Sequence, residues 1–84
     1  MARYFFDTCD GELAIPDEIG IDLTTREDVE STVRDLLFDL GHAEVLKGVN
    51  RTFTAVVRNA EGAVEYRGSL TLRIDACYAA NKGK

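Results

Sequence analysis

The sequence has few of the residues that mark metal, cofactor and nucleophile sites. It contains two cysteines, Cys9 and Cys77, which lie far apart without a C-x-x-C spacing, and a single histidine, His42. This pattern signals neither a zinc site nor a disulfide framework, so we expect buried or half-buried reduced thiols. No Ser-His-Asp set stands out, and the glycines are isolated instead of forming a phosphate-binding loop. We therefore expect no catalytic residue, no metal and no cofactor.

Long apolar runs and an excess of basic charge are also missing. No apolar segment approaches the roughly 20 residues that span a bilayer, and Phe5-Phe6 gives way at once to Asp7 where a signal peptide would continue. The 84 residues carry 15 acidic and 10 basic side chains, a net charge of −5, which disfavours nonspecific binding to nucleic acid or anionic lipid. We expect one soluble, cytoplasmic domain over residues 1–78, followed by a flexible tail at 79–84.

The N-terminal quarter of the chain has the signals of a β-hairpin and a bend. Residues 3–9 are of extended type, and the Asp-Gly pair at 10–11 is a favoured hairpin turn before a second strand at 12–15. Pro16 suits the second position of a turn, and Gly20 can adopt the left-handed conformation that closes it. We expect a hairpin followed by a bend at the PDEIG segment.

A helical pattern follows the bend. Thr24 and Glu27 fit a capping box, so the helix should begin there. Its apolar residues recur at spacings of three and four, as in a helix that packs on a sheet. These residues are Val29, Val33, Leu36, Leu37 and Leu40. Gly41 is a possible end, and a further turn through Ala43 and Leu46 up to Gly48 is the alternative.

The second half of the chain predicts another hairpin. Residues 52–59 are rich in β-branched and aromatic side chains, residues 60–62 form a short turn, and residues 64–74 alternate between apolar and polar. Such alternation is typical of a strand with one buried face. Gly68 interrupts the apolar row and suggests a β-bulge. The apolar set of the last strand is Val64, Tyr66, Leu70, Leu72 and Ile74.

This order of elements predicts an α+β fold, a two-layer β-β-α-β-β sandwich. Its four-stranded antiparallel sheet should have the strand order 2-1-3-4, with one main helix on one face. The expected helix-facing residues are Tyr4, Phe6, Phe53, Ala55, Val57, Tyr66, Leu70 and Leu72. The opposite face should stay open and carry Arg3, Phe5, Thr54, Val56, Arg58, Arg67, Thr71 and Arg73.

The acidic residues of the N-terminal loops are candidates for a cation site. They are Asp7, Asp10, Glu12, Asp17 and Glu18. Hard cations prefer such oxygen ligands, but the spacing fits no calcium loop, and turn formation accounts for Asp10 and Asp17. We therefore favour turn hydrogen bonds over metal binding. His42 is expected near the helix end, where it complements the helix dipole and does not act in catalysis.

The opening of the chain also resembles a family of small bacterial proteins of unknown function. The shared features are R-Y-F-F at residues 3–6, D-G at 10–11 and P-D-E-x-G-x-x-L at 16–23. This chain departs from the family at Ile19, where an acidic residue is common. The resemblance implies a compact α+β domain and carries no activity or cofactor. More loosely, the strand-strand-helix-strand layout is similar to that of HicB-type antitoxin domains, in fold order only.

The open sheet face and the last strand are the candidate interaction surfaces. On the open face the candidate residues are Phe5, Val56, Arg58, Arg67, Thr71 and Arg73. An aromatic residue among arginines can stack single-stranded bases, but the net acidity and pairing of the arginines with Asp7 or Glu65 argue against nucleic acid. The last strand contains no proline, so a second copy could extend it. We expect a non-catalytic interaction module that binds itself or another protein, with a nucleic-acid-associated or antitoxin-like regulator as the alternative.

Overall fold

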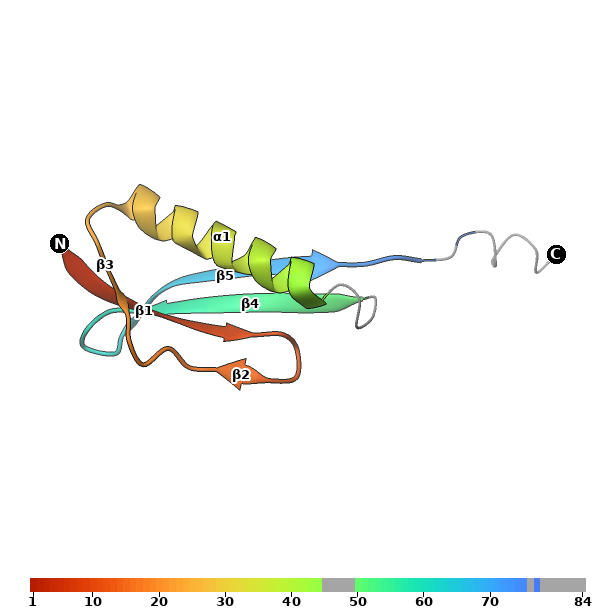
Figure 1. The fold of residues 1–84 in the computed structure, drawn as a ribbon, viewed down its shortest axis with the longest axis horizontal. Helices are drawn as coiled ribbons and strands as arrows, with labels where there is room; N and C mark the ends of the chain where they lie inside the picture. The colour runs from red at the N-terminus through yellow and green to blue at the C-terminus, as the bar shows by residue number, and fades with distance from the viewer. Residues whose placement is uncertain (45–49, 76, 78–84) are drawn as a thin grey trace.

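The computed structural model describes residues 1–44, 50–75 and 77. In these residues a helix lies along one face of an antiparallel sheet, which confirms an α+β domain (Figure 1). The elements in chain order are β1 (Ala2–Cys9), β2 (Ala14–Ile15), β3 (Ile21–Leu23), α1 (Arg26–Glu44), β4 (Arg51–Arg58) and β5 (Val64–Leu72). The predicted tail at 79–84 lies outside the described residues.

The sheet has five strands and not the predicted four. Its main path is β2-β1-β4-β5, and β3 also pairs with β1, antiparallel like the rest. The prediction missed β3 because three residues are too few to show alternation. This strand is defined by its pairing with the start of β1, where Ala2 lies opposite Leu23 and Tyr4 opposite Ile21. β2 and β3 therefore share one edge of β1, and residues 16–20 connect them.

The helix begins one residue later than predicted and passes through the expected stop. Thr25, and not Thr24, caps it, because the Asp28 N–H donates to Thr25 Oγ1 at 3.1 Å. At the other end α1 continues through Gly41 to Glu44. A Cβ on Gly41 would lie 3.0 Å from Leu70 Cδ2, so this glycine lets the helix approach β5 instead of ending it. The alternative end at Gly48 falls outside the described residues.

The core lies between α1 and the sheet, on the predicted face. One cluster joins Phe6, Val29 and Val57, and a second joins Leu37, Phe53 and Ala55. Tyr66 and Leu70 pack against these clusters, as expected from their parity in β5. The prediction that Val64 and Ile74, at the two ends of the apolar row, lie on the buried face is wrong. Val64 is 46% exposed and Ile74 is 57% exposed. The register shift places Val64 opposite Arg58 of the open face, and Ile74 lies beyond the end of β5 at Leu72.

Gly68 does not form the predicted bulge. It pairs regularly with Ala55, whereas the register shift lies between Val57 and Arg58, which pair with Tyr66 and Val64. A Cβ on Gly68 would lie 2.6 Å from Val33 Cγ1. Gly68 is therefore required by the close approach of α1 to β5.

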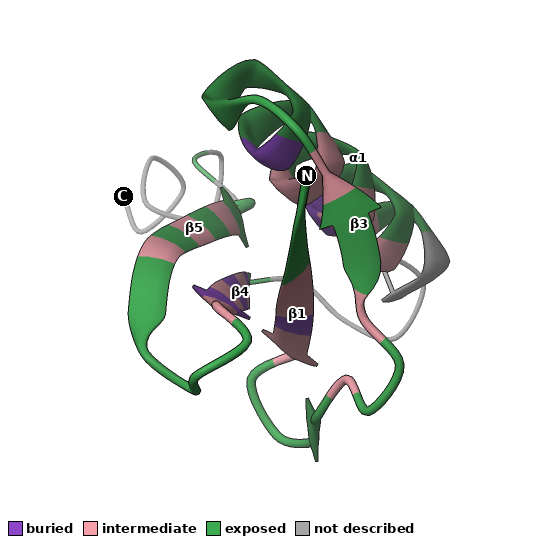
Figure 2. Ribbon diagram, turned by 90° about the vertical axis from the view of Figure 1, so that its left-hand side faces the viewer, coloured by how far each residue is buried: buried purple, intermediate pink, exposed green. Residues whose placement is uncertain are grey.

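The helix covers only part of its face of the sheet. It packs chiefly against β4 and β5, while β2 and β3 lie to one side of it (Figures 1 and 2). β2 and β3, at the edge of β1 away from β4, lie beyond the strands that α1 contacts most. No helix among the described residues combines the length and apolar character needed to cross a membrane.

Candidate interaction surface

The six predicted surface residues form two pairs, and the other two lie apart from them. Phe5 and Arg58 are opposite each other on β1 and β4, and the Arg58 guanidinium carbon lies 5.3 Å from the centre of the Phe5 ring. Val56 and Arg67 are paired across β4 and β5 and line a shallow hollow of about 340 Å³ on the open face. Thr71 is exposed near the end of β5. Arg73 lies beyond the last residue of β5 and forms an ion pair with Asp75 at 3.0 Å.

Arg58 is held by a polar cluster that the sequence predicted only in part. Its Nε donates to Asp7 Oδ2 at 2.6 Å and its Nη2 to Asp7 Oδ1 at 3.0 Å. The same Nη2 donates to the Asp17 carbonyl at 3.1 Å, and the Asp17 N–H donates to Asp7 Oδ1 at 2.9 Å. The pairing of Asp7 with an arginine of the open face is confirmed. Glu65 instead accepts a hydrogen bond from Asn59 Nδ2 at 2.8 Å.

Asp17 replaces a missing strand neighbour of β1. Its Oδ2 accepts the Phe6 N–H at 3.0 Å, and its Oδ1 accepts the N–H groups of Ile19 and Gly20 at 3.0 and 3.1 Å. Gly20 has φ +83°, which confirms the predicted left-handed closure of the bend. One carboxylate thus accepts the β1 N–H that has no strand partner in the gap between β2 and β3. The same carboxylate stabilises the bend of the P-D-E-x-G segment.

The other predicted turn carboxylate behaves in the same way. Asp10 Oδ1 accepts the N–H groups of Glu12 and Leu13 at 3.0 and 2.8 Å, and the Asp10 N–H donates to the Leu13 carbonyl at 3.2 Å. This longer turn explains why β2 begins at Ala14 and not at Glu12. The hydrogen bonds of Asp10 and Asp17 confirm the predicted turn chemistry.

Most of the positive charge of the open face is paired within the chain. The Nε and Nη2 atoms of Arg3 donate to the two carboxylate oxygens of Asp22 at 2.9 and 3.0 Å, and its Nη1 donates to the Ile19 carbonyl at 2.7 Å. Arg58 is paired with Asp7, and Arg73 with Asp75. These arginines therefore present less uncompensated charge to a polyanion than the sequence suggests.

These contacts lower the pKa values of several carboxyl groups. The Arg58 hydrogen bonds lower the pKa of Asp7, against an opposing effect of partial burial. Partial burial raises the pKa of Asp17, but the hydrogen bonds from Phe6, Ile19 and Gly20 outweigh it and the net shift is downward. Hydrogen bonds from Leu13 and Glu12 lower the pKa of Asp10. The Arg3 side chain lowers that of Asp22.

We expect the domain to lose stability at acid pH. Because these four carboxyls have pKa values below the ordinary 3.8 when folded, the unfolded chain binds more protons as the pH falls. Their contribution is complete above about pH 5 and is lost as the pH drops through the folded pKa values, below 3.8. Urea unfolding followed by circular dichroism at pH 7, 4 and 3 measures this. Asp7→Asn should reduce the loss, and equal stability at pH 7 and pH 3 would contradict the assignment.

The outer edge of β5 exposes backbone groups. The Phe6 N–H points away from β4 toward Asp17, so Phe6 and Val57 form a non-hydrogen-bonded pair and the Val57 N–H points toward β5. By the same alternation, the residues of β5 that bond to β4 are Tyr66, Gly68 and Leu70. The residues that direct their N–H and C=O groups outward are Arg67, Ser69 and Thr71. The contact between the hydroxyls of Thr52 and Thr71, 3.1 Å apart, agrees with a closely spaced pair that is not hydrogen-bonded.

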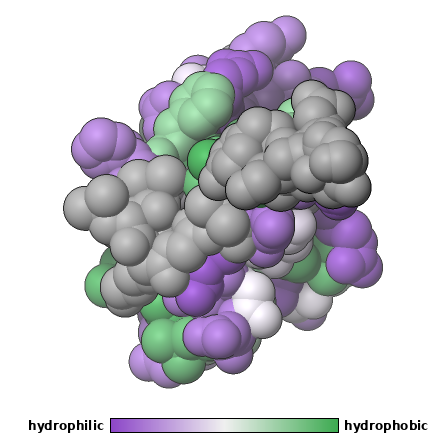
Figure 3. Space-filling model, turned by 90° about the vertical axis from the view of Figure 1, so that its right-hand side faces the viewer, coloured by the Kyte–Doolittle hydropathy of each residue, from purple (hydrophilic) through white to green (hydrophobic). Residues whose placement is uncertain are grey.

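The remaining sequence candidates lie apart from these surfaces. His42 is exposed in the last turn of α1, as predicted. Cys9 is half-buried and its Sγ accepts the Gly11 N–H at 3.4 Å, whereas Cys77 is exposed and not buried or half-buried as expected. Both are free thiols. Seen from the end at which α1 and β5 finish, the described surface is mainly hydrophilic, with hydrophobic atoms in small separate areas (Figure 3).

Comparison with known proteins places this fold in a family. A family model described as "Domain of unknown function (DUF6894)" matches residues 3–71, a span that runs from β1 almost to the end of β5. The chain matches no curated protein and no solved structure. The match covers the aromatic first strand, the Asp17 bend, the helix and the second hairpin. The chain therefore belongs to the DUF6894 family of domains of unknown function.

Proposed function

We propose that this domain is a non-catalytic interaction module that pairs with a second copy of itself along β5. The observation that carries the proposal is the row of outward N–H and C=O groups on Arg67, Ser69 and Thr71. β5 contains no proline and ends the sheet path β2-β1-β4-β5. An added antiparallel strand would bond to these groups and continue the sheet.

The side chains of β5 suit a two-fold axis at Ser69. In that register Arg67 lies opposite Thr71 of the second copy, so each of these pairs and the Ser69 pair exchanges two hydrogen bonds. Like charges do not meet in these pairs, since Arg67 comes opposite the hydroxyl side chain of Thr71.

The polar contacts favour this proposal over catalysis and nucleic-acid binding. Asp10 and Asp17 are occupied by backbone N–H groups, and Asp7 by Arg58, so these carboxylates serve structure. The pairing of Arg3, Arg58 and Arg73 removes much of the basic patch that a nucleic-acid partner would need. Two free thiols support a cytoplasmic location, where disulfides are rare.

Proline at position 69 tests the pairing. Ser69→Pro removes an outward N–H, which a proline on an edge strand can lack without harm to the fold, whereas Ser69→Ala keeps it. We expect proline to weaken dimerisation about tenfold or more, because each copy loses a bond at the two-fold axis, while alanine has little effect. Sedimentation equilibrium at micromolar to millimolar concentration measures this. A wild-type monomer throughout, or equal association of both variants, would refute β5 pairing.

A further inference from the structure

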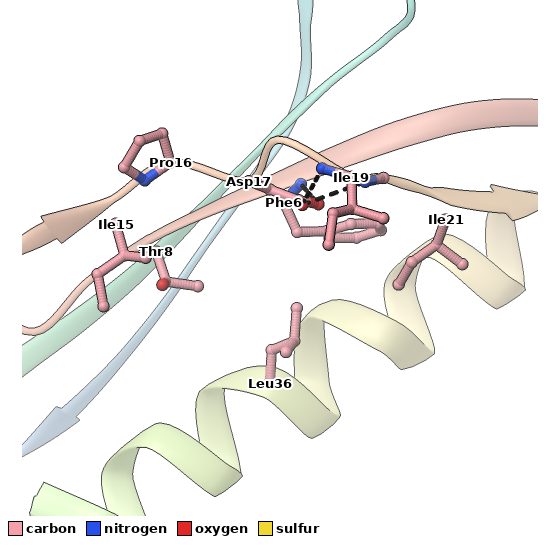
Figure 4. A pocket seen from close by; sticks show the side chains of 9 residues that line it. Phe6, Thr8, Ile15, Pro16, Asp17, Ile19, Ile21 and Leu36 are labelled. Carbon is pink, nitrogen blue, oxygen red and sulfur yellow. Dashed lines mark hydrogen bonds between the residues drawn. The ribbon is translucent and has the colours of Figure 1, made fainter.

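A second candidate surface lies at the edge of the sheet away from β5, on the face that α1 covers in part. An apolar groove of about 400 Å³ runs between α1 and residues 15–21, and its floor is Phe6 of β1. Leu36 points from the helix toward Phe6, and Ile15, Ile19 and Ile21 line the other wall (Figure 4). The groove exists because α1 sits over β4 and β5 and leaves the β1 side of its face uncovered.

The groove walls expose an unusual amount of aliphatic surface. Ile15 is 52% exposed, Ile19 is 78% exposed and Ile21 is 42% exposed. Three exposed isoleucines line this one groove, and apolar surface gathered in this way is typical of a binding site. The groove is open to solvent along its length, so an elongated partner fits it better than an enclosed small molecule.

The backbone in the middle of the groove, between β2 and β3, is largely hydrogen-bonded within the chain. The N–H groups of Phe6, Ile19 and Gly20 all donate to the Asp17 carboxylate. The carbonyls of Asp17 and Ile19 accept hydrogen bonds from Arg58 and Arg3. Recognition here therefore depends on side chains, as when an amphipathic helix lays its apolar face in a groove.

The rim of the groove is acidic. On α1, the side that continues from Leu36 away from β5 carries Asp28 and Asp39, both exposed. The basic residues of the helix, Arg26 and Arg34, fall on the β5 side or the outer face by the same spacing. Across the groove, Glu18 is exposed next to Ile19. A second copy of this acidic chain would bring like charges together, so the charge favours a basic partner.

We propose that this groove binds an amphipathic helical segment of another protein, with apolar side chains on one face and lysine or arginine at both margins of that face. Leucine-type anchors would insert between Leu36 and the three isoleucines, and the basic margins would meet Asp39 on one side and Glu18 on the other. The site does not depend on β5 pairing, since it lies at the other edge of the sheet. Loss of one interaction would leave the other measurable.

A designed peptide tests the groove. The probe is a fluorescent 18-residue Leu/Lys amphipathic helix, compared with a Leu/Glu peptide of the same apolar pattern, by anisotropy with the full chain. We expect Ile19→Asp to weaken Leu/Lys binding roughly tenfold or more. The matched control is Phe38→Asp, because Phe38 is also exposed, at 57%, but lies on the outer face of α1. Ile15→Asp is a second groove variant should Ile19→Asp alter the circular dichroism spectrum.

The control also separates groove binding from general electrostatic attraction. Both substitutions add one negative charge, so nonspecific attraction of the cationic peptide would increase equally in both. Two double variants provide a further comparison. Glu18→Lys with Asp39→Lys changes the two margins of the groove, whereas Glu30→Lys with Glu61→Lys changes the net charge equally away from the groove. We expect roughly fivefold or greater weakening from the first double variant only. No binding at 1 mM peptide (about the weakest affinity of interest), equal effects of groove and control variants, or tighter binding by Ile19→Asp would overturn the proposal.

Discussion

Replacing Asp17 with alanine is expected to lower the free energy of unfolding by about 2 to 4 kcal/mol. The change removes the acceptor for the N–H groups of Phe6, Ile19 and Gly20 in one step. The Phe6 N–H is the most costly of these, because it belongs to a buried residue in the middle of β1 and faces the gap between β2 and β3. Urea unfolding at pH 7 measures the loss.

Two further variants show which hydrogen bonds of Asp17 account for the expected loss of stability. Asp17→Asn keeps an oxygen that can accept the Ile19 and Gly20 N–H groups but loses the second acceptor, which binds Phe6, so its effect should be intermediate. Glu18→Ala alters the exposed neighbour and should change stability by less than about 0.5 kcal/mol. Hydrogen exchange should show faster exchange of the Phe6 amide in Asp17→Ala. An unchanged Phe6 amide, or equal losses in the Asp17 and Glu18 variants, would contradict this role for Asp17.

The parts of the fold with strong local periodicity could be predicted from the sequence. Val29, Leu37, Phe53 and Val57 occupy the core because their spacing of 3.6 or 2 places them on one face of a helix or strand. Strand neighbours followed from the connections, since a hairpin joins β4 to β5 and the crossover helix places β4 beside β1.

The features set by contacts distant in sequence could not be predicted in the same way. β3 exists because Ile21 and Leu23 meet Tyr4 and Ala2, a pairing with no local signal. Asp17 was assigned to its bend, but its bond to Phe6 requires knowledge that β1 lacks a neighbour there. The groove could not be predicted either, because it depends on how α1 lies over β4 and β5 and on how residues 15–21 stand beside it.

Gly68 illustrates the same limit, since an isolated glycine in a strand marks either a bulge or a close approach. Only the position of α1 decides between them, and it favours the close approach to Val33. Together with Gly41, which faces Leu70, this glycine brings the helix close to β5. The distance between helix and sheet is therefore set by small residues on both elements.

Gly68→Ala is accordingly expected to destabilise the domain by about 1 to 3 kcal/mol. This is the reverse of the usual effect, because alanine is normally more stable than glycine within a strand. The new methyl group would lie 2.6 Å from Val33 Cγ1 and 3.2 Å from Leu37 Cδ1. Val33 cannot turn aside easily, because a β-branched side chain in a helix has one strongly preferred rotamer. Ser69→Ala, a change on the exposed face of the same strand, is the matched control and should be nearly neutral.

A double-mutant cycle with Val33→Ala tests whether this steric contact is the cause. Val33→Ala alone should be destabilising through lost packing, but it removes the methyl group that a Cβ at position 68 would meet. Gly68→Ala should therefore cost much less in the Val33→Ala background, with a coupling free energy of about 1 to 2 kcal/mol. Urea unfolding of the four proteins gives this coupling directly. Additive effects would mean that the helix shifts away from β5 without strain, and the tight approach of α1 at Gly68 would then have no energetic role.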